Sequence, residues 1–230
     1  GIKKIICTYD KIDKLMEFIN PIEFKLMIDE YHNFLKQYSF RDKAINGVLA
    51  HFKEFKSYCF LSATPIPNNL KPAIFNDITE YMADWNTTDE ITVYPYHTNT
   101  PYMVAAKFIK TYQAKGCLNV NGIESKEAYF FINSVTEIKA ILKQTQLTED
   151  DYRIICADNP KNRKTLEGYT ISSSADAPKK FNFITSKSFE GVDFHSETGL
   201  CFVVSNVQNR HTLVSIDMDI PQIVGRIRTK

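Results

Sequence analysis

The stretch Lys25-Leu26-Met27-Ile28-Asp29-Glu30-Tyr31-His32 decides how this chain is interpreted. Its short apolar run, bounded by polar residues, predicts a buried strand that ends in two adjacent carboxylates and a histidine. The carboxyl ends of strands form the edge at which open α/β sheets bind ligands. Paired acids there suit phosphoryl transfer, in which one holds Mg²⁺ and the other orients or deprotonates water. A solvated loop is the alternative.

The composition is that of a soluble globular protein. The chain has 230 residues, which suffice for one large domain or two small ones, and 43% of them are hydrophobic and 24% charged. It contains neither an apolar run long enough to cross a bilayer nor a signal peptide at its start. A net charge of +1 neither requires nor excludes a nucleic-acid partner, because a neutral protein can carry a basic groove.

Cysteine usage indicates a reducing compartment. Four of the five cysteines lie in apolar, strand-like settings, and the full set is Cys7, Cys59, Cys117, Cys156 and Cys201. Without a C-x-x-C pair, neither a disulfide framework nor a zinc site is supported. Buried free thiols are expected, and the predicted location is cytoplasmic.

Both ends predict that the sequence is a piece of a longer protein. Gly1 stands where an initiator Met would be and is typical of a cloning remnant. A helix is predicted to begin at Gln222 and to have barely started at Lys230.

Strands alternate with helices, which predicts an α/β fold with parallel strands. The expected strands are 4–9, 24–28, 57–61, 90–94, 128–132, 152–157, 181–185 and 200–205, and the expected helices are 11–19, 40–56, 103–115 and 136–144. Asp10 and Thr136 are the expected N-caps and Gly116 the expected C-cap. Irregular, proline-rich sequence precedes a domain junction near 90–100, which gives domains 1–95 and 96–230.

Taken in order, several short motifs resemble those of the DExH-type nucleic-acid-stimulated NTPases of helicase superfamily 2. Asp29-Glu30-Tyr31-His32 matches motif II, and Ser62-Ala63-Thr64 matches motif III one helix and one strand later. Thr8-Tyr9 lies where the family has motif Ib, and Phe130-Phe131-Ile132-Asn133-Ser134 is similar to motif IV.

The later motifs extend the resemblance over essentially the whole chain. Residues 185–193, Thr-Ser-Lys-Ser-Phe-Glu-Gly-Val-Asp, are similar to motif V, and residues 222–226, Gln-Ile-Val-Gly-Arg, match the start of motif VI. The resemblance implies two RecA-like parallel-sheet domains, the first truncated at its N-terminus. ATP with Mg²⁺ would lie in the cleft between them, and a nucleic-acid strand would cross both.

The resemblance also assigns roles to residues. Asp29 would bind Mg²⁺, Glu30 would activate the lytic water, and Arg226 would be an arginine finger, since a guanidinium is always charged and forks onto phosphate oxygens. His32 and Gln222 would link the γ-phosphate to the domain interface. The other residues expected to act on the nucleotide side are Ser62, Thr64, Gly191, Asp193 and Arg228, and those expected to contact the nucleic-acid backbone are Thr8, Tyr9, Ser134 and Thr185.

Plainer interpretations stay open for the same residues. His32 alone would be an ordinary surface or capping histidine, Ser62 and Thr64 alone could cap a helix, and Gly191 could be a turn glycine. Basic residues at 161–164 and 179–180 form either a solvated face or a patch that contacts a phosphate backbone.

The sequence departs from the family pattern in two places. It contains no G-x-x-x-x-G-K-[ST] phosphate loop, and only 28 residues precede Asp29. We therefore expect these 230 residues neither to bind ATP tightly nor to hydrolyse it. In motif VI, Thr229 stands where a second arginine is usual, so Arg226 is favoured over Arg228 for the phosphate contact.

Two classes of function follow. The first is the core of an ATP-dependent helicase or translocase, with DNA favoured over RNA because Pro65 after Ser62-Ala63-Thr64 resembles the DNA-directed branch. Such a motor could also be fused to a nuclease or methyltransferase. The second is a degenerate RecA-like pair that binds nucleic acid or a protein without turnover. No membrane partner is expected.

Overall fold

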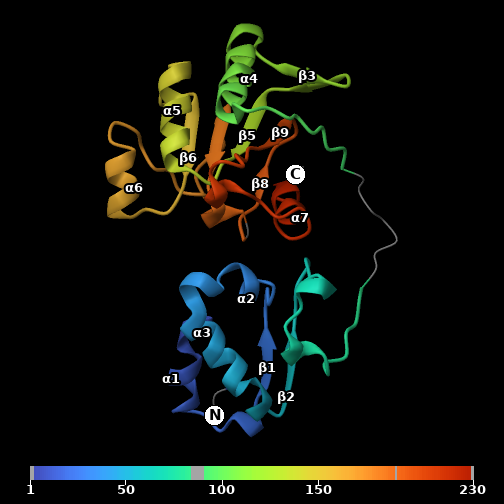
Figure 1. Cartoon of the computed structure of the whole chain (residues 1–230). Helices are drawn as coiled ribbons and strands as arrows, with labels where there is room; N and C mark the ends of the chain where they lie inside the picture. Colours follow the sequence, from blue (N-terminus) through green and yellow to red (C-terminus); the bar gives the residue numbers. More distant parts are fainter. Residues whose placement is uncertain (1–2, 84–90, 190, 229–230) are drawn as a thin grey trace. The chain divides into compact units, whose positions relative to one another are not determined.

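The computed structural model describes residues 3–83, 91–189 and 191–228. The chain forms two compact units, Gly1–Met82 and Ala83–Lys230 (Figure 1). Each unit contains parallel strands with helices, so the predicted α/β class is confirmed.

In the first unit two parallel strands pair over their full length. β1 (Lys25–Ile28) lies beside β2 (Ser57–Phe60), with Lys25 opposite Ser57 and Ile28 opposite Phe60. The other elements are η1 (Tyr9–Lys11), α1 (Ile12–Met16), η2 (Pro21–Glu23), α2 (Asn33–Lys36), α3 (Tyr38–His51), η3 (Phe52–Glu54), η4 (Asn68–Leu70) and η5 (Ala73–Phe75). The sequence therefore located both strands and the long helix between them.

This small sheet has one covered face and one exposed face. Alternate side chains of a strand point to opposite sides, so Ile28 and Phe60 join the core while Met27 and Cys59, paired across the strands, are exposed. The prediction of a buried strand at β1 was wrong for this reason, because only Ile28 of its four residues is buried, and so was the prediction that Cys59 is buried.

The N-terminal segment also differs from expectation. Residues 3–8 form no strand, Ile6 is 99% exposed and Cys7 is exposed. An apolar run becomes a strand only when another strand accepts its hydrogen bonds, and none of the described strands pairs with it. Asp10 does not cap the following helix either, because it lies within η1 and pairs with Arg41.

The second unit is built on a four-stranded parallel sheet in the order β6-β7-β5-β9. Its elements are α4 (Pro101–Lys115), β3 (Leu118–Val120), β4 (Ile123–Ser125), β5 (Glu127–Phe131), α5 (Val135–Thr145), β6 (Tyr152–Ile155), α6 (Pro160–Thr165), β7 (Phe181–Ile184), η6 (Ser186–Ser188), β8 (Phe194–His195), β9 (Gly199–Val203), η7 (Arg210–Thr212), α7 (Asp219–Val224) and β10 (Ile227–Arg228). Of the four strands in this sheet, β5 comes first in sequence and lies between β7 and β9.

Both faces of this sheet are covered. Alternate residues of β5 enter different cores: Ala128 and Phe130 pack with α4 and α5, while Tyr129 and Phe131 pack with Phe194 and with residues of α7. Strands buried on both faces read as continuous apolar runs, which is why the sequence located them well.

Several local predictions in this unit were wrong. Residues 91–94 form no strand, and Glu90 lies outside the described residues. Ser134, rather than Thr136, caps α5 by accepting a hydrogen bond from the Glu137 amide. The helix expected to begin at Gln222 in fact begins at Asp219 and ends at Val224. It ends there because Ile227 and Arg228 pair with β8 in a parallel bridge.

Other local features agree with the sequence. Gly116 ends α4 at φ 78°, and its amide donates to the carbonyl of Tyr112. Cys156 is buried, as predicted, whereas Cys201 is partly exposed.

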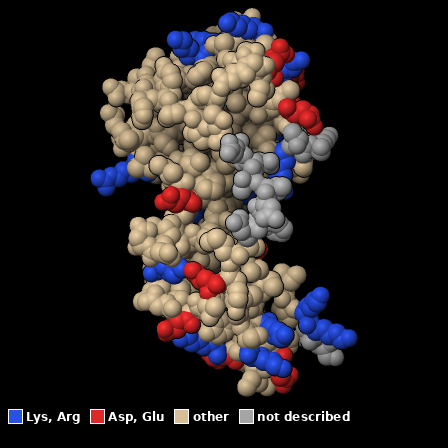
Figure 2. Space-filling model, turned by 90° about the vertical axis from the view of Figure 1, so that its right-hand side faces the viewer, with Lys and Arg blue, Asp and Glu red and all other residues tan. Residues whose placement is uncertain are grey.

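No helix in the described ranges is both long and apolar enough to span a bilayer. On the face in Figure 2, basic and acidic side chains are interspersed within each unit, and the described residues there form no extended patch of one sign.

Candidate functional site

The acidic pair occupies the turn that follows β1. Asp29 is exposed and Glu30 is partly buried, and the Glu30 amide donates to Asp29 Oδ1 at 3.1 Å. Glu30 has φ 51°, a left-handed conformation that only a few per cent of non-glycine residues adopt. Such backbone is held in place only by specific contacts, and it turns the chain sharply as the strand ends.

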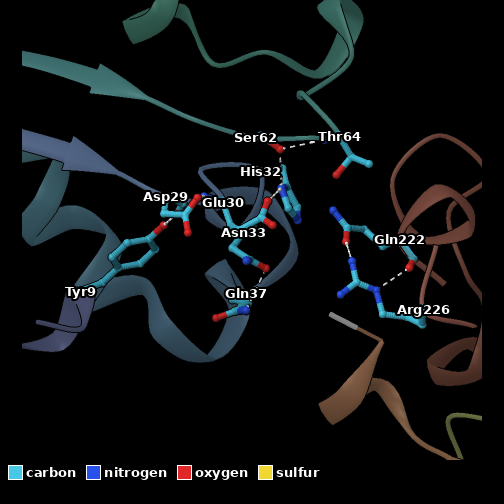
Figure 3. Close-up of polar contacts among 10 residues, drawn as sticks. All are labelled: Tyr9, Asp29, Glu30, His32, Asn33, Gln37, Ser62, Thr64, Gln222 and Arg226. Atoms are coloured by element: carbon cyan, nitrogen blue, oxygen red, sulfur yellow. Dashed lines mark hydrogen bonds and ion pairs between the residues drawn. The ribbon is translucent and has the colours of Figure 1, made fainter. Parts of the chain in front are cut away.

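A buried histidine connects the ends of the two strands (Figure 3). His32 is 0% exposed, and its Nδ1 lies 2.7 Å from Ser62 Oγ and 3.1 Å from Glu30 Oε2. Ser62 Oγ also accepts a hydrogen bond of 3.0 Å from the Thr64 amide. The two segments that resemble motifs II and III are thus joined by the hydrogen bond between His32 and Ser62, and the surface-histidine alternative does not hold because His32 is buried.

The opposite side of the acidic pair contacts Tyr9, whose hydroxyl donates to the backbone carbonyl of Asp29 (Figure 3). Burial, followed by the Asp29 carboxylate, raises the pKa of Tyr9 to about 12, so this hydroxyl keeps its proton at neutral pH. Thr8 is exposed, and its carbonyl begins η1 by accepting from the Lys11 amide.

The carboxylates suit a magnesium ion that also binds phosphates. Among residues 3–83, 91–189 and 191–228, no group of three His, Cys, Asp or Glu side chains is arranged to hold a metal. Mg²⁺ typically binds one or two carboxylates, several waters and substrate phosphates. Exposed Asp29 beside Glu30 fits that donor set, whereas a metal caged by protein ligands alone would not fit.

In the second unit the predicted arginine finger is held by its neighbours (Figure 3). Arg226 donates through Nε to the Gln222 carbonyl at 2.8 Å and through Nη2 to Gln222 Oε1 at 2.9 Å, while Nη1 lies 3.5 Å from Asp193 Oδ1. Asp193 also pairs with Arg228, whose side chain is 56% exposed against 15% for Arg226. The segments that resemble motifs V and VI therefore meet at Asp193.

Two of the predicted nucleic-acid contacts have hydroxyls already engaged by the protein. Ser134 is 8% exposed and caps α5. Thr185 is 6% exposed, and its hydroxyl and amide both donate to the carbonyl of Ile155. They follow the carboxyl ends of the neighbouring strands β5 and β7, as the sequence predicted. Their hydroxyls, however, form hydrogen bonds within the protein.

The remaining predicted features have plain structural roles. Gly191 has φ 71° with open space around it, as a turn glycine does, and Glu190 lies outside the described residues. Arg163 pairs with Asp158, and Lys179 and Lys180 each donate to a backbone carbonyl. These contacts favour the solvated-face interpretation of the basic residues.

Sequence reasoning missed a polar chain behind the acidic turn. Gln37 donates to Asn33 at 2.8 Å, and Arg41 donates to Gln37 at 2.7 Å and pairs with Asp10. Residues 33, 37 and 41 are spaced four apart, a local signal for side-chain contacts, although here they span the junction of α2 and α3 and a kink at Arg41. Asn133 was also overlooked: it accepts from the Ser186 amide at 3.3 Å and donates to the His211 carbonyl at 2.7 Å.

The structure thus brings the predicted residues together in two groups, one in each unit. The first contains Tyr9, Asp29, Glu30, His32, Ser62 and Thr64, and the second contains Asp193, Gln222, Arg226 and Arg228. Comparisons of this chain with protein-family models, with curated proteins and with solved structures found no match.

Proposed function

We propose that this chain is the core of an ATP-dependent nucleic-acid helicase or translocase of superfamily 2, with two RecA-like domains and with DNA as the favoured substrate. The observation that carries the proposal is a run of polar contacts: Glu30 Oε2 lies 3.1 Å from His32 Nδ1, His32 is hydrogen-bonded to Ser62, and Ser62 accepts from the Thr64 amide. It joins the two turns that follow β1 and β2, so a displacement of the acidic turn changes the contacts of the second turn.

In this function ATP with Mg²⁺ supplies the phosphoryl group and a cation that neutralises its charge. Asp29 would hold the cation, because its carboxylate is exposed at the end of a strand. Glu30 would orient the attacking water and accept its proton. The left-handed backbone of Glu30 supports this role, since such conformations concentrate at active sites.

Arg226 is proposed to stabilise charge on the transferred phosphate. Its contacts with Gln222 and Asp193 hold the guanidinium in one orientation, which lowers the entropy lost when it binds a phosphate. The bonds of Nε and Nη2 to Gln222 can stay in place while Nη1 exchanges Asp193 for a phosphate, and Asp193 then keeps Arg228 as its cation.

The test is ATP hydrolysis by the longest chain that the gene encodes, measured with single-stranded DNA, duplex DNA and RNA. Glu30→Gln should lower kcat by at least about 100-fold while nucleotide binding is retained, because the carboxylate base is lost and the side-chain shape is kept. Glu17→Gln, at an exposed carboxylate of the same unit, is the matched control and should leave kcat unchanged. Failure of every nucleic acid to stimulate hydrolysis would end the proposal.

The runner-up is a scaffold that binds nucleic acid or a protein without turnover. The feature that separates it from the motor is the phosphate loop, whose backbone amides and lysine hold the β- and γ-phosphates. An intact loop upstream in the parent chain favours the motor, and its absence there favours the scaffold. A scaffold predicts no hydrolysis by the longest chain and no effect of Glu30→Gln on binding of a partner.

A further inference from the structure

Tyr9 was expected to contact nucleic acid, but its hydroxyl is directed at the acidic turn. It donates to the backbone carbonyl of Asp29, twenty residues along the chain. This carbonyl belongs to the peptide that joins Asp29 to Glu30, so the contact acts on the backbone that carries both carboxylates.

That peptide is held at both of its polar ends. Its carbonyl accepts from Tyr9, and its amide, on Glu30, donates to Asp29 Oδ1 at 3.1 Å. On the far side of Glu30, the Tyr31 amide donates to the Leu61 carbonyl at 3.1 Å. The left-handed conformation of Glu30 is unfavourable by itself and persists only because contacts of this kind fix it.

The Tyr9 ring is fixed as well. Phe34 packs against it edge-on with a centroid distance of 5.4 Å, and the Arg41 guanidinium lies 5.6 Å from its centroid. Arg41 is in turn held by Asp10 and Gln37. The hydroxyl is therefore presented to Asp29 by a ring with little freedom to rotate.

We propose that Tyr9 is a positioning residue that sets the orientation of the Asp29–Glu30 peptide and thereby the placement of the two carboxylates. The proposal rests on the proposed function and deepens it, since the Tyr9 hydroxyl bonds to the Asp29 carbonyl and acts through the backbone. Thr8 is exposed and directly precedes Tyr9, so a strand bound at Thr8 would act on the acidic pair through this one contact.

The first experiment measures amide hydrogen exchange by NMR in the 230-residue chain. Tyr9→Phe keeps the ring against Phe34 and Arg41 and removes the hydroxyl, and it should speed exchange of the Glu30 and Tyr31 amides about 10-fold, the effect of losing one hydrogen bond. Amides of the α3 core, such as that of Val48, report whether the variant has folded.

Tyr38→Phe is the matched control, because it also removes a tyrosine hydroxyl from the first unit, one bonded to Asn46. It should leave the Glu30 and Tyr31 amides unchanged. Exchange at these two amides within about twofold of wild type in Tyr9→Phe, with the α3 amides still protected, would overturn the proposal.

The second experiment uses the longest chain that the gene encodes. Tyr9→Phe should lower kcat for ATP about 10-fold and leave the KM for nucleic acid unchanged, because a positioning contact acts on the chemical step. A raised KM with unchanged kcat would instead make Tyr9 a nucleic-acid contact and refute the proposal. If the wild-type chain hydrolyses no ATP, the proposed function fails, and the exchange measurement still decides whether Tyr9 holds the peptide.

Discussion

Tyr112 shows how burial changes the chemistry of one side chain. It is 0% exposed, and its hydroxyl lies 2.7 Å from Ser125 Oγ. Ser125 donates its own proton to the Glu127 carbonyl, so Tyr112 is the donor of this pair. Burial raises the pKa of Tyr112 from 10.0 to about 12, because the phenolate would lose its hydration.

Because of this raised pKa, part of the free energy of unfolding is lost at alkaline pH. A raised pKa means that the folded state holds the proton more tightly than the unfolded state does. The contribution is therefore complete below pH 10 and is lost as the pH rises toward about 12, at a cost of about 3 kcal/mol.

We expect Tyr112→Phe to lower the free energy of unfolding by about 1 kcal/mol at pH 8, because one buried hydrogen bond is lost. The difference from wild type should shrink or reverse by pH 11, since phenylalanine cannot ionise. Urea unfolding at both pH values measures this. Tyr96→Phe, at a side chain that is 68% exposed, is the control and should show no such change. A constant difference at all pH values would contradict the assignment.

Across neighbouring elements, β6 and β7 share a buried polar pair. Arg153 and Asn182 face each other in the register of the two strands, and they are 2% and 0% exposed. Arg153 Nε donates to Asn182 Oδ1 at 2.6 Å, and its guanidinium also lies over the Phe194 ring. Burial lowers the pKa of Arg153, although an arginine stays charged at neutral pH.

A buried charge is costly when it loses its partner. Asn182→Leu should therefore destabilise the second unit by about 3–5 kcal/mol, since the Arg153 guanidinium keeps its charge and loses an acceptor. Adding Arg153→Met removes that charge, so the double variant should be more stable than Asn182→Leu alone. Denaturant unfolding of the four members of this cycle gives the coupling. Additive effects would show that the two side chains do not depend on each other.

Whether a predicted helix or strand was correct depended on how far apart in the sequence its backbone hydrogen-bond partners lie. Helices and doubly buried strands were found because their signal is local: periodic apolar residues for α3 and α4, and short runs rich in aromatic and aliphatic residues for β5 and β7, the latter interrupted by Asn182. Residues 3–8 and 91–94 have equally apolar sequences but no strand beside them among the described residues. Strand pairing is a non-local event, and a single segment does not encode its partner.

At the level of the whole molecule, each compact unit has a core of its own. The core of the first unit includes Phe52, which is 1% exposed and packs on Tyr58 at a centroid distance of 4.7 Å. In the second unit Phe183 is 0% exposed and stacks on Phe130 at 5.4 Å. A cavity made in one core should therefore lower the stability of that unit and leave the other unit unchanged.

Phe52→Ala should cost about 3–5 kcal/mol and raise hydrogen exchange throughout β1, β2 and α3 while β5 and β7 stay protected. Phe183→Ala is its counterpart and should do the reverse. Mass-spectrometric exchange on both variants tests this. Equal loss of protection in both units from either substitution would show that they unfold as one cooperative body.

The candidate site contains residues that the sequence identified and contacts that only the structure shows. The sequence made Asp29 and Glu30 candidates as carboxylates that follow a strand, and the resemblance of the motifs in order added His32 and Arg226. The contact of Tyr9 with the Asp29 carbonyl has no sequence signal, since it joins a phenol to a backbone atom twenty residues away. The engagement of the Thr185 hydroxyl by the Ile155 carbonyl was hidden for the same reason. The Ser134 cap, in contrast, has a local signal in the Ser-x-x-Glu pattern of residues 134–137.

The sequence alone determined the α/β class, the positions of most helices and buried strands, and the chemical types at the carboxyl end of β1, because these depend on local periodicity and composition. Only the tertiary structure decided which apolar runs became strands, which sheet face stayed exposed, and that a buried histidine joins the two strand ends. The physical reason is that a hydrogen bond needs a partner, and the chain places most partners far apart in sequence.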